Sequence, residues 1–303
     1  MLKSLLIWSK MNKINKKNIF VIFVLFTCQQ SNNAQTIKYS TSWFGPNANP
    51  VPEFTDARIP AKTTISLMGD YYFGYEDQTT NGYVKVEIPL LPERVSLKLW
   101  STVLEHFNTS DELMQVRGAS KASGFEGGDV YVQTRIRLLK EQNSLPSIIL
   151  NSTLKSASAK TVTTRRYFDT PGYYFDAEIG KSFYTKSNFI NEIRLVGNVG
   201  FMCWETTNST QDDATMYGGK LIIGNTGWKL ENTVSGYTGW MHSNRYYSSN
   251  YGDSPMVYAA KFTLMSKKIE YFAQYQYGIT DFPYHQIRVG VSFPIGALTP
   301  DFK

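Results

Sequence analysis

Hydrophobic and polar residues alternate with a period of two over most of the chain beyond its first sixty residues. Within residues 285–295, for example, Ile287 and Val289 fall on one face while Arg288 and Gly290 fall on the other. Successive side chains of a β-strand point to opposite faces, so this pattern predicts strands with one apolar and one polar face. A soluble sandwich with one wet face would show the same alternation.

The length of the segments and of their connections favours a membrane barrel over a sandwich. Most segments span about ten residues, as tilted membrane-spanning strands do. Short connections such as 225–226 alternate with long polar ones such as 107–127, and outer-membrane barrels have short periplasmic turns and long outer loops. The sequence therefore predicts an all-β fold, a transmembrane antiparallel β-barrel of about twelve strands. Strands are expected near 64–75, 82–91, 94–106, 128–139, 145–156, 173–184, 189–204, 215–224, 227–240, 255–265, 268–279 and 285–296.

Residues 36–62 interrupt the alternation and contain four prolines. Proline cannot donate a hydrogen bond to a β-ladder, so this segment predicts an extended N-terminal arm rather than a strand. We assign residues 35–62 to the arm and residues 63–303 to the barrel. The arm can lie in the periplasm or fold back into the lumen, and the sequence leaves both alternatives open.

Residues 1–34 are predicted to form a signal peptide. A short apolar run from Ile19 to Cys28 follows several lysines, which is the pattern of an export signal and too short for a spanning helix. Cleavage after Ala34 is the expected ending, and lipidation at Cys28 is the alternative. Together with the strand pattern, the leader predicts a protein integral to the outer membrane of a Gram-negative bacterium, with lipid and lipopolysaccharide around the barrel.

Composition excludes several other classes of protein. Aromatic residues make up 15% of the chain and charged residues only 18%, and no run of about 20 apolar residues follows the leader, as a helical membrane protein would require. The net charge of +6 comes largely from five leader lysines. The mature chain is therefore close to neutral, and we predict no nucleic-acid partner.

Aromatic residues cluster at the ends of the predicted strands, where outer-membrane barrels carry aromatic girdles at both membrane interfaces. A high β-propensity of aromatic residues is the simpler explanation of the same clusters. The girdle candidates are Tyr71, Tyr72, Phe73, Tyr75, Tyr173, Tyr174, Phe175, Phe183, Tyr184, Trp228, Trp240, Tyr246 and Tyr247.

If the apolar faces meet lipid, the polar faces line the lumen, with ten basic against six acidic positions. In an open channel, this excess would favour anionic solutes. Alternatively, the charges pair across strands and fill the lumen as a closed lattice. The lumen-lining residues that we expect are Lys98, Arg135, Arg137, Asp176, Glu178, Arg194, Lys229, Glu231 and Arg288.

The mature chain offers little chemistry for catalysis. His106, His242 and His285 are dispersed, so we predict no metal site and no catalytic residue. A lipase-type site would need a histidine beside a serine, for which His242 and Ser243 in a loop are candidates. Phosphate loops and dinucleotide fingerprints are missing, so we expect no cofactor. Cys203 would have no cysteine partner in the mature chain, so a disulfide framework is not expected.

The segment from about Pro92 to Trp204 resembles an outer-membrane barrel family named after meta-pathway phenol degradation, within the wider porin group. The resemblance implies a barrel that takes up small, often hydrophobic compounds. The chain departs from that family where Lys155-Ser156-Ala157-Ser158 replaces a Pro-Thr-Gly segment. The leader and the Ala34-Gln35 junction look similar to exported proteins of Bacteroidota. The motifs that carry the resemblance are Pro92-Glu93-Arg94-Val95, Gly127-Gly128-Asp129, Phe175 to Lys181 and Arg194 to Phe201.

From the sequence we predict a monomeric outer-membrane channel or transporter for small solutes, either anionic or hydrophobic, through a polar, basic lumen. Two alternatives belong to other classes: an outer-membrane enzyme of lipase type, and a closed structural barrel whose outer loops bind a partner.

Overall fold

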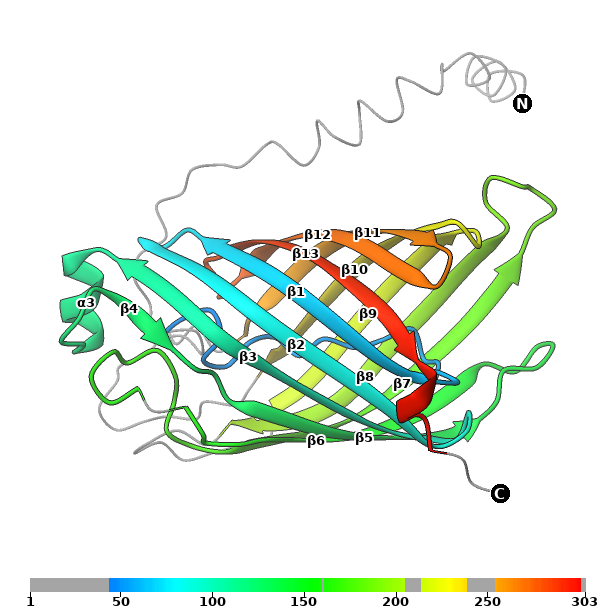
Figure 1. The fold of residues 1–303 in the computed structure, drawn as a ribbon, viewed down its shortest axis with the longest axis horizontal. Coiled ribbons are helices and arrows are strands. Elements are labelled where there is room, and N and C mark those ends of the chain that lie inside the picture. Colours follow the sequence, from blue (N-terminus) through cyan, green and yellow to red (C-terminus); the bar gives the residue numbers. More distant parts are fainter. Residues whose placement is uncertain (1–43, 160, 205–213, 239–253, 301–303) are drawn as a thin grey trace, which may run out of the picture. The chain divides into compact units, whose positions relative to one another are not determined.

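In the described part of the chain, twelve long antiparallel strands close into a barrel, and a thirteenth short strand extends one end (Figure 1). The computed structural model describes residues 44–159, 161–204, 214–238 and 254–300, so the expected signal peptide lies outside it. The strands are β1 (Thr63–Phe73), β2 (Asp77–Leu91), β3 (Val95–Thr109), β4 (Ser123–Glu126), β5 (Val130–Leu139), β6 (Ser147–Lys155), β7 (Gly172–Tyr184), β8 (Glu192–Trp204), β9 (Ala214–Gly224), β10 (Trp228–Thr238), β11 (Met256–Ser266), β12 (Ile269–Thr280) and β13 (His285–Ile295).

The barrel closes between its first and last strands. Each strand pairs with its neighbours in sequence, and β1 pairs with β13 along its whole length, with Asp70 opposite Arg288. The short strand β4 adds to the end of β3, while β5 pairs with the rest of β3. Closure leaves no long strand with unpaired backbone groups, which is what a sheet needs inside a bilayer. The predicted all-β barrel is confirmed.

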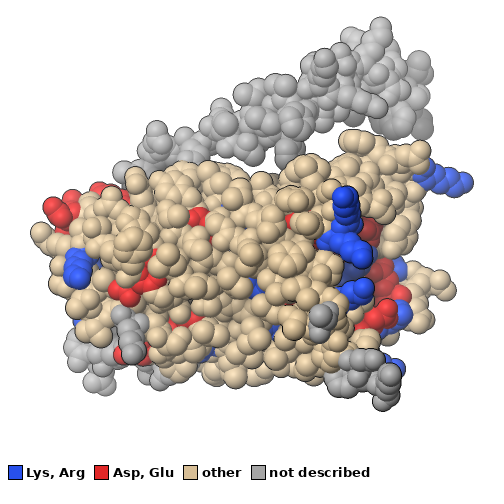
Figure 2. All heavy atoms as spheres, in the orientation of Figure 1, with Lys and Arg blue, Asp and Glu red and all other residues tan. Residues whose placement is uncertain are grey.

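The alternation of the sequence becomes an apolar outside and a polar inside. In β13, Ile287 and Val289 are 47% and 56% exposed, whereas Gln286 and Arg288 are 1% and 4% exposed. Figure 2 shows an outer wall made mostly of uncharged residues, with charged residues gathered mainly at the two ends of the barrel. A closed barrel with such a belt is suited to the hydrocarbon core of a membrane.

The connections differ in length at the two ends of the barrel, as the sequence predicts. One end carries the short connections, such as 92–94, 225–227 and 267–268, and we name it the turn end. The opposite end, the loop end, carries the longer connections between β3 and β5 and between β6 and β7.

The loop between β3 and β5 holds a helix that the sequence reading missed, α3 (Asp111–Arg117). Ser110 caps its N-terminus by accepting a hydrogen bond from the backbone N–H of Leu113, and Gly118 ends it with a left-handed φ of 66°. These are ordinary start and stop signals of a helix, which a search for strands overlooked. No helix in the described residues is both long and apolar enough to cross a membrane.

A β-bulge in β3 changes which residues face the lumen. The register against β2 shifts after Gly82, so Val103 and Leu104 both lie outside, at 61% and 52% exposed. Glu105 then turns inward and is completely buried. A bulge inserts one extra residue and re-aims the side chains beyond it, so simple alternation does not find Glu105.

The aromatic girdle is present only in part among the described residues. Tyr71 and Phe175 face outward, at 38% and 40% exposed, but Tyr72 and Tyr174 are buried inside the barrel. Neighbours on a strand point to opposite faces, so consecutive aromatic residues cannot all belong to one girdle. Assigning Tyr72 and Tyr174 to the girdle was wrong. Trp240, Tyr246 and Tyr247 lie outside the described residues.

The outward face of β13 makes a direct test of membrane insertion. Val289→Arg places a charge midway along the wall and should lower the free energy of unfolding by about 2–4 kcal/mol. Val130→Arg, at the loop end of β5, is the matched control and should cost about 0–1 kcal/mol. Urea titration in lipid vesicles measures both. Equal costs at the two positions would contradict an immersed wall.

Candidate functional site

The described residues of the N-terminal arm, 44–62, lie inside the barrel (Figure 1, blue). At the loop end, Asn47 Nδ2 donates to Glu105 Oε2 at 2.6 Å; at the turn end, Arg58 Nη2 donates to Ser182 Oγ at 3.0 Å. Ala48, between these contacts, is completely buried. Of the two positions that the sequence leaves open, the described residues of the arm therefore occupy the lumen.

A carboxylate on the wall holds the middle of the arm. Glu178 of β7 accepts hydrogen bonds from the backbone N–H and the hydroxyl of Thr55, at 2.8 and 2.7 Å. It also accepts from the Ala57 N–H at 3.1 Å and forms an ion pair with Arg135 Nη2 at 3.2 Å. Arg135 in turn donates to Thr55 Oγ1. The arm thus supplies donors for a carboxylate buried in the wall, which would otherwise cost free energy.

Toward the turn end, two basic side chains of the wall hold carbonyl groups of the arm. Arg194 of β8 is completely buried and donates from Nε to the Asp56 carbonyl at 2.7 Å. Lys220 of β9 donates to the Phe54 carbonyl at 2.7 Å, with its ammonium 4.9 Å from the Phe54 ring centre. These contacts satisfy arm carbonyls that no β-ladder pairs.

Two glycines of the wall make room for the arm. A Cβ added at Gly218 would lie 2.4 Å from the Phe54 ring, and one at Gly180 would lie 2.8 Å from the Ala57 Cβ. Glycine inside a strand often marks a close approach of another chain segment. These two glycines therefore mark in the sequence where the arm packs against the wall. The alternation of strand residues does not by itself reveal this.

Nearer the loop end, Glu53 of the arm reaches a basic part of the wall. Its carboxylate lies 2.5 Å from Arg288 Nη1 and 3.3 Å from Lys85 Nζ. Enclosure by the barrel wall tends to raise the pKa of Glu53, but the charges of Arg288 and Lys85 hold that pKa well below its usual value. Because the folded-state pKa is the lower one, these ion pairs stabilise the seated arm above the ordinary pKa and are lost as the pH falls through the depressed value.

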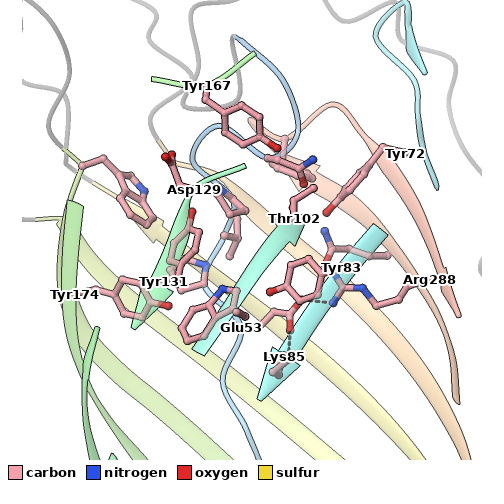
Figure 3. A pocket seen from close by; sticks show the side chains of 18 of the residues that line it. Glu53, Tyr72, Tyr83, Lys85, Thr102, Asp129, Tyr131, Tyr167, Tyr174 and Arg288 are labelled. Atoms are coloured by element: carbon pink, nitrogen blue, oxygen red, sulfur yellow. Dashed lines mark hydrogen bonds and ion pairs between the residues drawn. The ribbon is translucent and has the colours of Figure 1, made fainter. Parts of the chain in front are cut away.

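Two cavities between the arm and the wall stand out among the described residues. The larger, about 600 Å³, is lined by the wall from β8 through β13 and on through β1, β2 and β3 to β5, and reaches the turn end at Lys268. The smaller, about 60 Å³, lies nearer the loop end and is ringed by aromatic side chains (Figure 3). Glu53, Lys85, Lys98 and Arg288 line both cavities, so this charged group stands between them.

Above the aromatic cavity, a buried network ties the loops to the strands. Arg166, from the loop between β6 and β7, donates to Asp77 and Glu105, each at 2.6 Å. Arg117 of α3 donates to the same Asp77 at 2.8 Å, and the Tyr167 hydroxyl donates to Glu105 at 2.7 Å. Buried charges are tolerated when each has a partner of opposite charge, and here the partners come from separate loops.

Comparisons with known proteins bear on the fold. An outer membrane channel from Pseudomonas putida F1 is similar to this chain with a TM-score of 0.58 and 9% identity, over 80% of this chain and 100% of the channel. The chain has the fold of an outer-membrane β-barrel. It is integral to the bacterial outer membrane, as its closed wall and apolar belt require.

Two further solved structures share less of this geometry. The KdgM porin in complex with disordered oligogalacturonate has a TM-score of 0.44 and 9% identity, over 77% of this chain and 99% of the porin. The outer membrane protein Omp33 from Acinetobacter baumannii has a TM-score of 0.38 and 9% identity, over 80% and 100%. No family model matches the chain. No curated protein matches it either.

The barrel places the expected lumen residues on the inward faces of its strands. Arg137 shares the inward face of β5 with Arg135 and lies at the turn end, where it pairs with Glu93 at 3.4 Å. Lys229 and Glu231 line the larger cavity. The role of all these residues in permeation stays a prediction. Those buried within the interior are Lys98, Arg135, Asp176, Glu178, Arg194 and Arg288.

Sequence reading missed the residues that come from outside the regular strands. Glu53 belongs to the arm, and nothing in its neighbourhood of prolines marks it as a ligand of the wall. Arg117 and Arg166 come from loops, whose path the strand period does not predict. Glu105 was missed because of the bulge described above.

The three histidines of the mature chain, among which the lipase-type alternative would find its base, lie on the outside of the barrel or beyond the described residues. His285 shares the outward face of β13 with Ile287; its Nδ1 lies 2.8 Å from the Tyr275 hydroxyl, and its ring stacks on Phe73. His106 is exposed and packs against Phe125. His242 and Ser243 fall outside the described residues.

The seat of the arm is tested by two neighbouring glycines that point to opposite faces. Gly218→Leu should displace Phe54, because a side chain there overlaps its ring. The Thr55 amide should then exchange with solvent about tenfold faster or more, since a hydrogen bond to a charged group contributes about 1.5–3 kcal/mol. Gly219→Leu, where a Cβ meets open space, is the control. Similar exchange in both variants would mean that the arm is not seated there.

Proposed function

We propose that the protein is an outer-membrane channel for small solutes, in which the arm controls the path through the lumen. The observation that carries this proposal is the cavity of about 600 Å³ that runs along the arm from the turn end to Glu53. A structural barrel would gain from filling this space, because packed interiors are favoured over voids. A cavity lined by polar side chains is instead what the passage of a small solute requires.

The charges around this cavity favour anionic solutes. Nine Lys and Arg side chains line it, against six Asp and Glu side chains. Rings of basic side chains favour anions in a pore. Several of these cations are already held by carboxylates, as Lys261 is by Glu231 at 3.3 Å, so we expect a moderate preference rather than a strict one.

A continuous path through the lumen requires the arm to move. Beyond Glu53, the arm and the surrounding aromatic side chains leave only about 60 Å³, which is room for a few water molecules at most. The arm is held by hydrogen bonds and ion pairs rather than by pairing in the sheet. It can therefore leave while the barrel stays closed.

The resemblance of residues 92–204 to the meta-pathway phenol-degradation barrels supports uptake of small compounds. Membership of that narrower family and an origin in Bacteroidota belong to the same proposal. We further propose that the barrel acts as a monomer, with lipid and lipopolysaccharide against its outer belt. A closed barrel that binds a partner through its loops is the alternative, favoured by the buried network around Arg166.

A reversible lock tests the role of the arm. The Ser147 Oγ donates to the Ala57 carbonyl at 2.9 Å, so Ala57→Cys and Ser147→Cys, with Cys203→Ser, should form a disulfide between arm and wall. Single-channel recording in planar bilayers should show no current when the pair is oxidised and wild-type current after reduction. Equal current in both states would show that the path bypasses the arm. A wild-type barrel that folds but never conducts would favour the closed alternative.

Charge reversal in the larger cavity tests selectivity. Lys229 lines that cavity near the turn end, so Lys229→Glu should shift the reversal potential in a salt gradient toward cations. Lys186→Glu, on an exposed turn outside the cavity, should leave the reversal potential unchanged. The same shift in both variants would assign selectivity to surface charge rather than to the cavity.

A further inference from the structure

We propose that Lys85, Lys98 and Arg288 form a binding site for the carboxylate of a small organic acid, and that Glu53 of the arm occupies this site at rest. We name these three residues the wall cation cluster. The proposal rests on the proposed function in one respect, that the arm can leave its seat. It adds the chemical class of the solute and the event that releases the arm.

Arg288 contacts two carboxylates, one of which belongs to the wall and the other to the arm. Its Nε and Nη2 donate to the two carboxylate oxygens of Asp70, at 2.6 and 2.7 Å, and its Nη1 reaches Glu53 at 2.5 Å. The Asp70 side chain is 1% exposed, whereas the Glu53 side chain is 44% exposed. Asp70 therefore belongs to the wall and orients the guanidinium, while Glu53 occupies the remaining position and faces the cavities.

The two lysines of the cluster lack a carboxylate of the wall. Among the described residues, Glu53 is the carboxylate within 4 Å of Lys85. No described carboxylate lies within 4 Å of Lys98, which is 3% exposed and has the Trp100 ring 4.9 Å from its ammonium. A buried ammonium without an anion is costly. An anion bound beside Lys98 would offset this free-energy cost.

The carboxylate opposite Lys98 in the strand register forms its contacts with other side chains. Glu87 stands opposite Lys98 across β2 and β3, but its carboxylate accepts from Arg135 at 2.5 Å and from Ser96 at 2.7 Å. The wall thus directs Glu87 toward Arg135 and leaves Lys98 available. When Glu53 leaves, Lys85 and Lys98 both stand ready for an incoming carboxylate.

The arm contributes Pro50, Val51 and Pro52 to the lining of the aromatic cavity, so its departure makes room there for the rest of such a molecule. Figure 3 shows Tyr131 and Tyr174 on one side and Tyr72 and Tyr83 on the other, with Glu53 between them. The Tyr131 hydroxyl and the Trp204 Nε1 are buried and have no hydrogen-bond partner among the described residues. Two unused donors in an aromatic pocket call for an acceptor on the ligand. We therefore infer an acid with an apolar body, a class that the pocket can both pack and orient.

Competition for the cluster couples binding to arm release. A carboxylate that takes the place of Glu53 removes the arm's ion pairs with Arg288 and Lys85, so the bound solute favours the displaced arm. By the reciprocity of linked equilibria, a seated arm must weaken solute binding by the same factor. Glu53 is tethered, so it acts as a competitor at a high effective concentration.

Titration calorimetry of the full-length protein in detergent tests the site with butyrate, which reproduces the Glu53 side chain from its Cα outward. Glu53→Gln should bind butyrate about tenfold more tightly than the wild type, because the tethered competitor is gone. Lys98→Gln should bind it about tenfold more weakly, because the unpaired cation is lost. Lys140→Gln, on an exposed turn, is the matched control and should bind as the wild type does. Butyramide, without the charge, should not bind.

The site is refuted if Glu53→Gln and Lys98→Gln bind butyrate as the wild type does, once heat-modifiable mobility shows that both variants are folded. It is also refuted if butyramide binds as well as butyrate. Saturating butyrate should speed exchange of the Thr55 amide in the wild type; unchanged exchange would refute the coupling to the arm. Calorimetry does not depend on ion current. If a folded barrel that never conducts binds butyrate as expected, the channel is rejected and the binding site is kept.

Discussion

The structure depends on one electrostatic constraint: charges enclosed by the barrel need partners, and the wall alone does not supply all of them. Glu178 is 1% exposed and takes three hydrogen bonds from the arm. Lys85 finds its carboxylate in Glu53 of the arm. A barrel of this size holds more space than its inward side chains fill. The arm therefore fills part of the lumen and supplies partners for some of the charges that the wall leaves unpaired.

The same constraint is the basis of the proposed release of the arm. The described residues of the arm contact single polar atoms of the wall and pack against Gly180 and Gly218, and they do not pair with a strand along a continuous ladder. Each such contact can exchange with water or with a ligand that offers the same chemistry. The wall, by contrast, is held by pairing along every long strand. The proposed gating rests on this difference, because the wall and the arm have separate sources of stability.

The strand period predicts the barrel well and the site poorly, for physical reasons. Alternation reports which face of a strand a residue occupies, so Arg135 and Arg288 were placed correctly in the interior. It cannot register a bulge, which hid Glu105. The girdle assignment failed because it grouped neighbours such as Tyr71 and Tyr72, which alternation places on opposite faces. The arm follows no period at all, because its conformation is set by the wall around it. The sequence therefore places individual charged residues in the lumen, but it does not show which residues of the arm they contact.

The most direct test of this account is the position of the arm in a lipid bilayer. Spin labels at Asp56→Cys and Lys186→Cys, with Cys28→Ser and Cys203→Ser, report the distance between the arm and the turn end by pulsed electron resonance. The account predicts one narrow distance distribution, as for two positions on a single rigid body. A broad distribution would mean that the arm does not rest in the lumen, and the proposed control of the path would fall with it.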